Sequence, residues 1–269
     1  MHGFSLASRR LALAALVLAA SVGPAASFGP LAVARADTGC IATSPGVVTA
    51  APADTVFLVP GLGRSPRSMR RLERDLTGRG YRVVNLPFDS RSETVDALAR
   101  RLADLVDLFA PGDGGRVHFV THSMGGLVVR DYLARSRPDN LGRVVMLSPP
   151  NGGSEIVDLL HRVPLLGAHL GPSRGALGTT AVDVPATLGP VDYEVGVVAG
   201  GRSFNPIFSW LLPGEDDGVV SVARMRVDGM RELRVVPRSH SFIMNGRDSI
   251  ALTAAFLRDG TFGPDRGGR

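Results

Sequence analysis

The segment THSMGG, Thr121 to Gly126, places a serine between two apolar stretches. A serine on a sharp turn from a strand into a helix is lifted above the edge of a sheet, and this crowded turn needs small neighbours. Gly125 and Gly126 supply them, whereas Thr121 stands where the G-x-S-x-G pattern has its first glycine. The pattern predicts that Ser123 is a nucleophile. The alternative interpretation is that Ser123 only caps the following helix.

A serine nucleophile needs a base, and the base needs an acid that orients it. With this kind of turn the partners follow in the order Ser, Asp or Glu, His. Of the six histidines, His240 alone follows a late strand, so we predict that it is the base rather than a surface-loop residue. His118 is expected in the core, and His122 is expected to point to the opposite face of its strand end. His161 and His169 come too early in the chain for this order.

The acid is expected in the loop that follows the strand predicted at 193–199. The segment PGEDDGVVSV contains Glu215, Asp216 and Asp217. Asp217 directly precedes the apolar residues at 219 and 220, where the chain returns to the interior, so it is held best and we favour it. Asp216 is the alternative acid, and a solvated acidic turn without a catalytic role is the other interpretation.

Attack by serine on a carbonyl develops an oxyanion, which two preorganised backbone N–H groups stabilise. In this architecture one belongs to the residue after the nucleophile, here Met124, and the other to the loop after the first strand. Gly61 and Gly63 allow close approach of that loop, so the Leu62 N–H is the predicted second donor. Alternatively, Pro60 and Gly61 form no more than a tight turn.

The elements that would position these residues alternate regularly between strand and helix. Short β-branched runs that end in Gly or Pro predict strands, and apolar residues at helical spacing predict helices. The expected strands are 55–59, 81–86, 116–121, 143–147, 193–199 and 233–236; the expected helices are 66–79, 93–109, 124–135 and 249–258. Continuous apolar strands alternating with helices predict a mostly parallel sheet with helices on both faces.

Residues 149–190 interrupt this alternation. A long interruption in a compact domain is often a functional loop. Four apolar residues share one helical stripe, and three more leucines follow it: Ile156, Leu159, Leu160, Val163, Leu165, Leu166 and Leu170. We interpret the insertion as a small lid over an acyl pocket, or alternatively as a helix packed permanently on the sheet edge. Phe208 and Trp210 are expected either to line the same pocket or to lie in the core.

The first 36 residues have the order of an export signal, which is removed from the mature protein. Arg9 and Arg10 precede an apolar run at 11–20 that is too short to span a bilayer, and Ala36 follows small residues. The arginine pair allows either the general or the twin-arginine route. Cleavage after Ala36 leaves 233 of the 269 residues: an irregular lead-in at 37–54 and one domain at 55–269.

Composition argues against several classes of protein. Without the three leader arginines, 27 basic residues face 25 acidic ones, and none of the basic residues is a lysine. Such a balance does not indicate nucleic-acid binding. The single cysteine, Cys40, excludes an internal disulfide. A lipid anchor on Cys40 is disfavoured because no apolar residue precedes it where a lipoprotein signal has one, so we expect an exported, periplasmic or extracellular monomer.

Together, the segments PGLG, THSMGG, DDGVV and SHSF resemble the α/β-hydrolase superfamily, and more narrowly its bacterial triacylglycerol lipases and esterases. The likeness runs from Thr55 to about Leu257 and implies the α/β-hydrolase fold with a small lid-like insertion. The lipases usually carry His-Gly-x-Gly after the first strand, and Pro60 stands here in place of the histidine. The resemblance assigns these roles: nucleophile Ser123, acid Asp217, base His240, oxyanion donors Leu62 and Met124.

The resemblance implies an exported serine hydrolase that cleaves acyl or lipid esters through an acyl-enzyme, without a cofactor and with transient contact to a lipid surface. Some relatives hold a structural Ca²⁺ near the histidine, but the acid nearest to His240 is Asp248, so we predict no metal. One alternative is an acyltransferase that uses an envelope alcohol as acceptor. The other is a lipid-binding module of the same fold without catalysis.

Overall fold

The computed structural model describes residues 53–264 except 111, 113, 162–171 and 173–176. Six strands form one sheet in the order β2-β1-β3-β4-β5-β6, and every neighbouring pair is parallel. The strands are β1 (Thr55–Val59), β2 (Arg82–Asn85), β3 (Val117–His122), β4 (Leu141–Leu147), β5 (Val195–Gly200) and β6 (Glu232–Val236). All six predicted strands are present, with ends that differ by no more than two residues.

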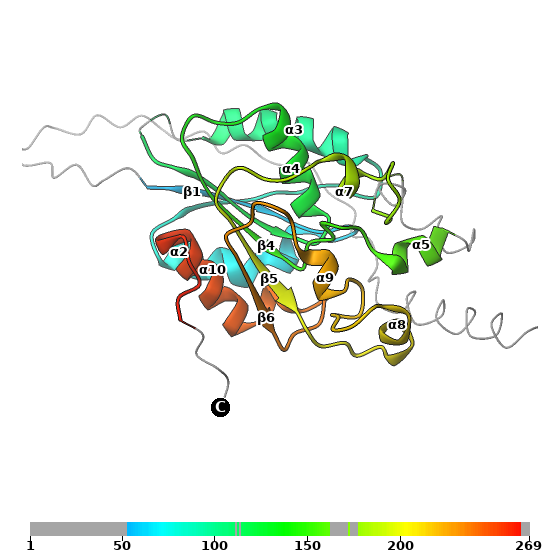
Figure 1. Cartoon of the computed structure of the whole chain (residues 1–269). Coiled ribbons are helices and arrows are strands. Elements are labelled where there is room, and N and C mark those ends of the chain that lie inside the picture. Colours follow the sequence, from blue (N-terminus) through cyan, green and yellow to red (C-terminus); the bar gives the residue numbers. More distant parts are fainter. Residues whose placement is uncertain (1–52, 111, 113, 162–171, 173–176, 265–269) are drawn as a thin grey trace, which may run out of the picture. The chain divides into compact units, whose positions relative to one another are not determined.

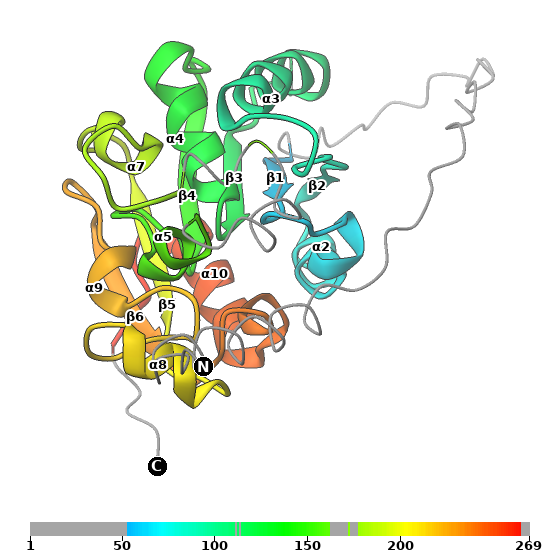
Figure 2. The ribbon, with the colours of Figure 1, turned by 90° about the vertical axis from the view of Figure 1, so that its right-hand side faces the viewer.

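Helices cover both faces of this sheet, as the alternation predicted (Figure 1). α3 (Val95–Phe109) and α4 (Gly125–Arg135) lie on one face; α2 (Arg70–Gly78) and α10 (Arg247–Asp259) lie on the other. Figure 2 shows the same arrangement from the side. The shorter elements are α5 (Glu155–His161), α7 (Val184–Thr187), α8 (Pro206–Leu211), α9 (Val222–Met225) and two 3₁₀ helices, η1 (Pro66–Met69) and η4 (Ile243–Asn245).

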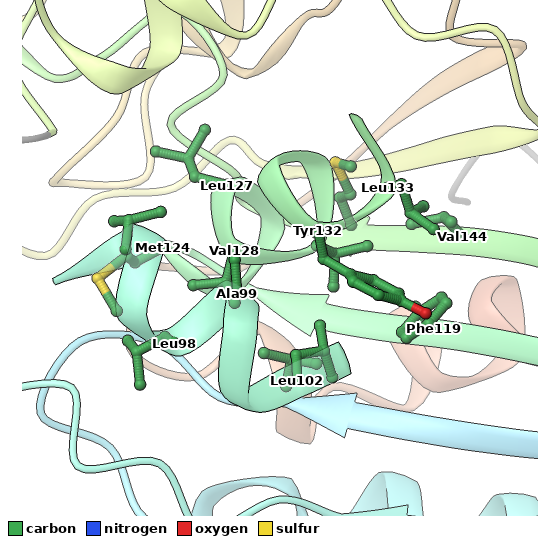
Figure 3. Close-up of a cluster of buried hydrophobic side chains, with 14 of the residues drawn as sticks. Leu98, Ala99, Leu102, Phe119, Met124, Leu127, Val128, Tyr132, Leu133 and Val144 are labelled. Carbon is green, nitrogen blue, oxygen red and sulfur yellow. The ribbon is translucent and has the colours of Figure 1, made fainter. Parts of the chain in front are cut away.

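The core has two layers because successive strand residues face opposite sides of the sheet. On β1, Phe57 packs toward α3 and α4, and Leu58 packs toward α2 and α10. Figure 3 shows the first layer, in which Leu98 and Leu102 of α3 meet Val128 of α4. Since both faces are covered, the buried strands are mostly apolar, which is why their types were predictable from sequence.

The insertion at 149–190 lies partly outside the described residues, which exclude Val163, Leu165, Leu166 and Leu170. In α5, Ile156 and Leu160 are buried. Glu155 at the start of α5 forms an ion pair with Arg224 of α9 over 2.8 Å. This part of the insertion is therefore a packed helix, and the lid remains a prediction. None of the helices in the described part of the chain is long and apolar enough to cross a membrane.

Candidate active site

Ser123 lies at the turn from β3 into α4, where the backbone is held in an unusual conformation. Its φ of +53° is in the left-handed region, which non-glycine residues rarely adopt. The Ser123 N–H still belongs to the sheet and donates to Leu147 O over 2.9 Å, and the Ser123 carbonyl accepts from the Gly126 N–H over 2.9 Å. The side chain is half-buried, so it remains accessible at the carboxyl edge of the sheet.

Neighbouring atoms lie close to both glycines that follow Met124, and closest to Gly125. A Cβ on Gly125 would lie 2.4 Å from the Val59 carbonyl oxygen of β1, which is well inside van der Waals contact. A Cβ on Gly126 would lie 3.4 Å from Oγ1 of Thr121. The atom nearest to that Cβ would be Cβ of Pro149 at 3.1 Å, so Gly126 is less tightly constrained than Gly125.

His240 brings the other two predicted residues together. Its Nε2 is 2.9 Å from Ser123 Oγ, and its Nδ1 is 2.7 Å from Asp217 Oδ2. A carboxylate only accepts hydrogen bonds, so Nδ1 carries the proton and Nε2 is left as the acceptor for the serine hydroxyl. The imidazole is therefore held in the tautomer that can take a proton from Ser123.

Asp217 is held from several directions. Its Oδ1 accepts from the Val219 N–H over 3.0 Å and from the Val220 N–H over 2.9 Å, and its backbone carbonyl accepts from the His240 N–H over 3.0 Å. The residue is 2% exposed, and these bonds compensate for the burial of its carboxylate. Asp216 points elsewhere: its Oδ1 accepts from the Gly218 N–H and from Ser209 Oγ.

The two predicted oxyanion donors are the backbone N–H groups of Leu62 and Met124. Among the hydrogen bonds of the described residues, neither the Leu62 N–H nor the Met124 N–H has an acceptor. The loop that carries Leu62 touches the nucleophile turn, because a Cβ on Gly61 would lie 3.0 Å from Ser123 Cβ and 2.8 Å from His122 Nδ1. Gly61 is therefore needed for this approach.

Ser90, which the sequence patterns did not reveal, braces the loop in which Pro60 stands in place of histidine. The buried Ser90 Oγ accepts from the Gly63 N–H over 2.8 Å and donates to the Gly61 carbonyl over 3.5 Å. These contacts straddle Leu62. The one sequence signal for Ser90 is its place just after a predicted strand. Its partners could not be predicted from this, because they lie 27 and 29 residues earlier in the chain.

His122 does not point away from the site, so that expectation is wrong. Its ring lies 5.1 Å from the His240 ring, and Nε2 donates to the His240 carbonyl over 2.9 Å. The strand ends at His122, and the side chain reaches across to the loop that follows β6. Burial, then the charges of His240 and Arg64, lowers the pKa of His122 well below its ordinary value, so it stays neutral.

The remaining histidines behave differently from these two. His118 is a core histidine, as predicted: its Nδ1 accepts from the Arg143 N–H over 2.8 Å, and Nε2 is 3.3 Å from Asp54. His169 and the side chain of His161 lie outside the described residues. In the described part of the chain, no cluster of three metal-ligating side chains is present. Asp248 pairs with Arg238 instead.

Several solved hydrolases have a similar fold. The mature Bacillus licheniformis lipase BlEst2 is 19% identical, with a TM-score of 0.57 over 78% of this chain and 93% of that one. The metagenomic carboxyl esterase MGS0156 is 19% identical, with a TM-score of 0.56 over 74% of this chain and 67% of that one. Aspergillus fumigatus lipase B is 15% identical, with a TM-score of 0.56 over 80% of this chain and about half, 55%, of that longer one.

At these identities, the likeness concerns the fold. A search of curated proteins finds no match. The sequence profile of the alpha/beta hydrolase family, in contrast, matches residues 56–258, which contain nearly all of the six-stranded sheet and all three residues of the Ser123–His240–Asp217 chain. The protein therefore belongs to the alpha/beta hydrolase family.

Proposed function

We propose that the protein is a serine hydrolase that cleaves carboxylic esters of acyl chains or lipids through an acyl-enzyme. The observation that carries this proposal is the hydrogen-bonded chain from Ser123 through His240 to Asp217, with contacts of 2.9 and 2.7 Å. A binding module of this fold would have no need of all three residues in hydrogen-bond reach. The fold of solved lipases and esterases supports an ester as substrate.

The reaction proceeds in two halves. Ser123 Oγ attacks the ester carbonyl while His240 Nε2 takes its proton, and the N–H groups of Leu62 and Met124 stabilise the oxyanion. His240 returns the proton to the departing alcohol, which leaves an acyl-serine. A water molecule then attacks the acyl group while His240 accepts a proton from it. When the tetrahedral intermediate collapses, His240 returns this proton to Ser123 Oγ and the acid is released. Asp217 stabilises the imidazolium that forms in both halves.

The test is hydrolysis of p-nitrophenyl esters from short to long acyl chains. We expect Ser123→Ala to lower kcat by about 10³-fold or more. Asp217→Asn is expected to lower kcat strongly, by up to about 10⁴-fold, whereas Asp216→Asn is the matched control and keeps most of the activity. Equal rates for wild type and Ser123→Ala would refute the proposal, and the chain-length optimum separates a lipase from an esterase.

We also propose transient contact with lipid surfaces. Among the described residues, three aromatic side chains have most of their surface exposed: Phe204 (69%), Trp210 (73%) and Phe242 (60%). Phe242 follows His240 by two residues. Trp210 is the sole tryptophan of the chain, so its emission reports contact directly. A blue shift on addition of phosphatidylcholine vesicles is expected, and an unchanged spectrum would contradict the proposal.

We further propose that the protein is exported and that residues 1–36 are removed on the way. The basis is the order of arginines, apolar run and small residues at the start of the chain. N-terminal sequencing of the protein secreted by a bacterial host should begin at Asp37. A product that begins at Met1 would show that this segment is retained.

A further inference from the structure

Two arginines at the oxyanion loop have no counter-ion among the described residues. Arg64 and Arg91 are half-buried, yet neither guanidinium forms an ion pair or a hydrogen bond within the described part of the chain. Each of the other half-buried or buried arginines there has such a partner: Arg130, Arg143, Arg224, Arg234 and Arg238. Among the described residues, Arg64 and Arg91 are therefore the exceptions to a general pairing of partly buried arginines.

Both side chains lie around the loop that carries Leu62. Arg91 rests on the oxyanion loop, since its Nε and Nη2 lie 3.0 and 3.1 Å from a Cβ built on Gly63. Arg64 follows that glycine, and its charge is one of the causes that lower the pKa of His122. His122 directly precedes Ser123. Arg91 thus lies against the loop that carries the Leu62 N–H, and the charge of Arg64 acts on the residue that precedes the serine.

This arrangement is unfavourable in the absence of an anion. Withdrawing a guanidinium from water costs free energy unless an acceptor replaces the lost hydration. For Arg64, burial lowers the pKa of the guanidinium, although the group stays charged at neutral pH. Two acids lie two residues from Arg91 in sequence. Asp89 is exposed and forms no ion pair with either arginine, and Glu93 pairs with Arg101 over 2.9 Å. A bound anion would compensate both guanidinium groups.

We propose that Arg64 and Arg91 bind an anionic group of the substrate, so that the preferred esters carry a carboxylate or a phosphate near the scissile bond. The planar fork of a guanidinium matches the paired oxygens of both groups. The inference rests on the proposed ester hydrolysis at Ser123 and narrows its substrate class. An acylated glycerol phosphate fits this description, whereas a neutral triacylglycerol does not.

The experiment compares matched ester pairs that differ in one anionic group. Monoacylglycerol is paired with the same acylglycerol 3-phosphate, and p-nitrophenyl butyrate is paired with mono-p-nitrophenyl glutarate. We expect wild type to favour the anionic ester of at least one pair by about tenfold or more in kcat/KM. Arg64→Gln and Arg91→Gln should each lower this ratio, and the double variant should abolish it. The two pairs distinguish phosphate from carboxylate as the ligand.

Arg67→Gln is the matched control, because Arg67 is exposed and lies three residues from Arg64. It should keep the ratio of wild type. The inference is overturned if wild type favours the anionic ester of neither pair, if the double variant keeps the preference, or if Arg67→Gln lowers it equally. Circular dichroism of each variant confirms that the fold is retained.

A second readout separates this inference from the proposed function. Calorimetric titration of glycerol 3-phosphate into Ser123→Ala measures anion binding without hydrolysis. If Ser123→Ala binds glycerol 3-phosphate and the same protein with Arg64→Gln and Arg91→Gln added does not, the anion site is supported. This holds even if wild type cleaves no ester, in which case only the proposed function fails. Hydrolysis that depends on Ser123, without any anion preference or binding, leaves the proposed function in place and overturns the anion site.

Discussion

At the scale of single residues, the peptide between Gly61 and Leu62 is tightly controlled. The Gly61 carbonyl accepts from the Arg64 N–H over 3.1 Å and from Ser90 Oγ over 3.5 Å. Carbonyl and N–H point in opposite directions across a trans peptide bond, so bonds that fix the carbonyl also fix the direction of the Leu62 N–H. In the proposed reaction Ser90 is therefore a positioning residue, which acts on the oxyanion through this peptide.

We expect Ser90→Ala to lower kcat for p-nitrophenyl esters by about tenfold while KM changes little. The effect should be smaller than the loss of an oxyanion donor itself, which costs about 10²–10³ in kcat, because the Leu62 N–H remains present. Ser92→Ala is the control, since Ser92 is exposed and bonds only within its own turn. Steady-state kinetics of both variants tests the idea, and a change in KM alone would contradict it.

Sequence could predict which three residues the structure brings together. Ser123, Asp217 and His240 follow one another as the architecture requires, and the apolar residues that follow Asp217 favour it over Asp216. The contacts of Ser90 and His122 could not be predicted, for a physical reason. Each acts through contacts between loops that are far apart in sequence, 27 residues for Ser90 and 118 for His122, and no local pattern encodes such contacts.

At the scale of elements, the approach of α4 to β1 determines where the serine stands. Gly125 at the start of α4 lies against the carbonyls of Val59 and Pro60, whose oxygens would be 2.4 and 2.9 Å from a Cβ at this position. Both neighbours are backbone atoms, which cannot rotate away as a side chain would. The helix would have to move as a whole, and the Ser123 turn would move with it.

We therefore expect Gly125→Ala to destabilise the fold by about 1–3 kcal/mol or more, as overpacking does, and to abolish ester hydrolysis. Gly78→Ala is the matched control: it ends α2, has open space around its Cα and a φ outside the left-handed region. That change should be neutral or stabilise by up to about 1 kcal/mol. Urea unfolding of both variants gives the comparison, and equal effects would contradict the packing argument.

The types of the elements were predictable, whereas their ends depend on individual contacts. The helix expected from residue 93 begins at Val95, because Thr94 Oγ1 accepts from the Ala97 N–H over 3.2 Å and caps it. The stretch expected as one helix at 66–79 divides into a 3₁₀ turn and α2 at Met69. Apolar spacing is shared by both kinds of helix, so it could not reveal that division.

At the scale of the whole molecule, two buried histidines link stability to pH. Burial lowers the pKa of both His118 and His122 below the ordinary value of 6.5. Below about pH 6.5, the unfolded chain therefore binds protons that the folded chain does not, so the free energy of unfolding decreases as the pH falls. The slope is at most about 1.4 kcal/mol per pH unit for each histidine.

Urea unfolding at pH 7.5, 6.5 and 5.5 should show this decrease. His122→Gln, which keeps a side-chain N–H for the His240 carbonyl, should have a shallower slope because one of the two groups no longer titrates. The same slope in wild type and variant would show that His122 does not contribute.

The three residues of the proposed reaction stand on three separate connections, after β3, β5 and β6. Ser123 and His240 are 117 positions apart, and their contact requires that the sheet has assembled from its centre to the last strand. The rate of the proposed ester hydrolysis therefore depends on the folding of the entire domain and not on one part of it. A variant library that is selected for ester cleavage is selected at the same time for completed assembly, so one colorimetric screen would serve both purposes.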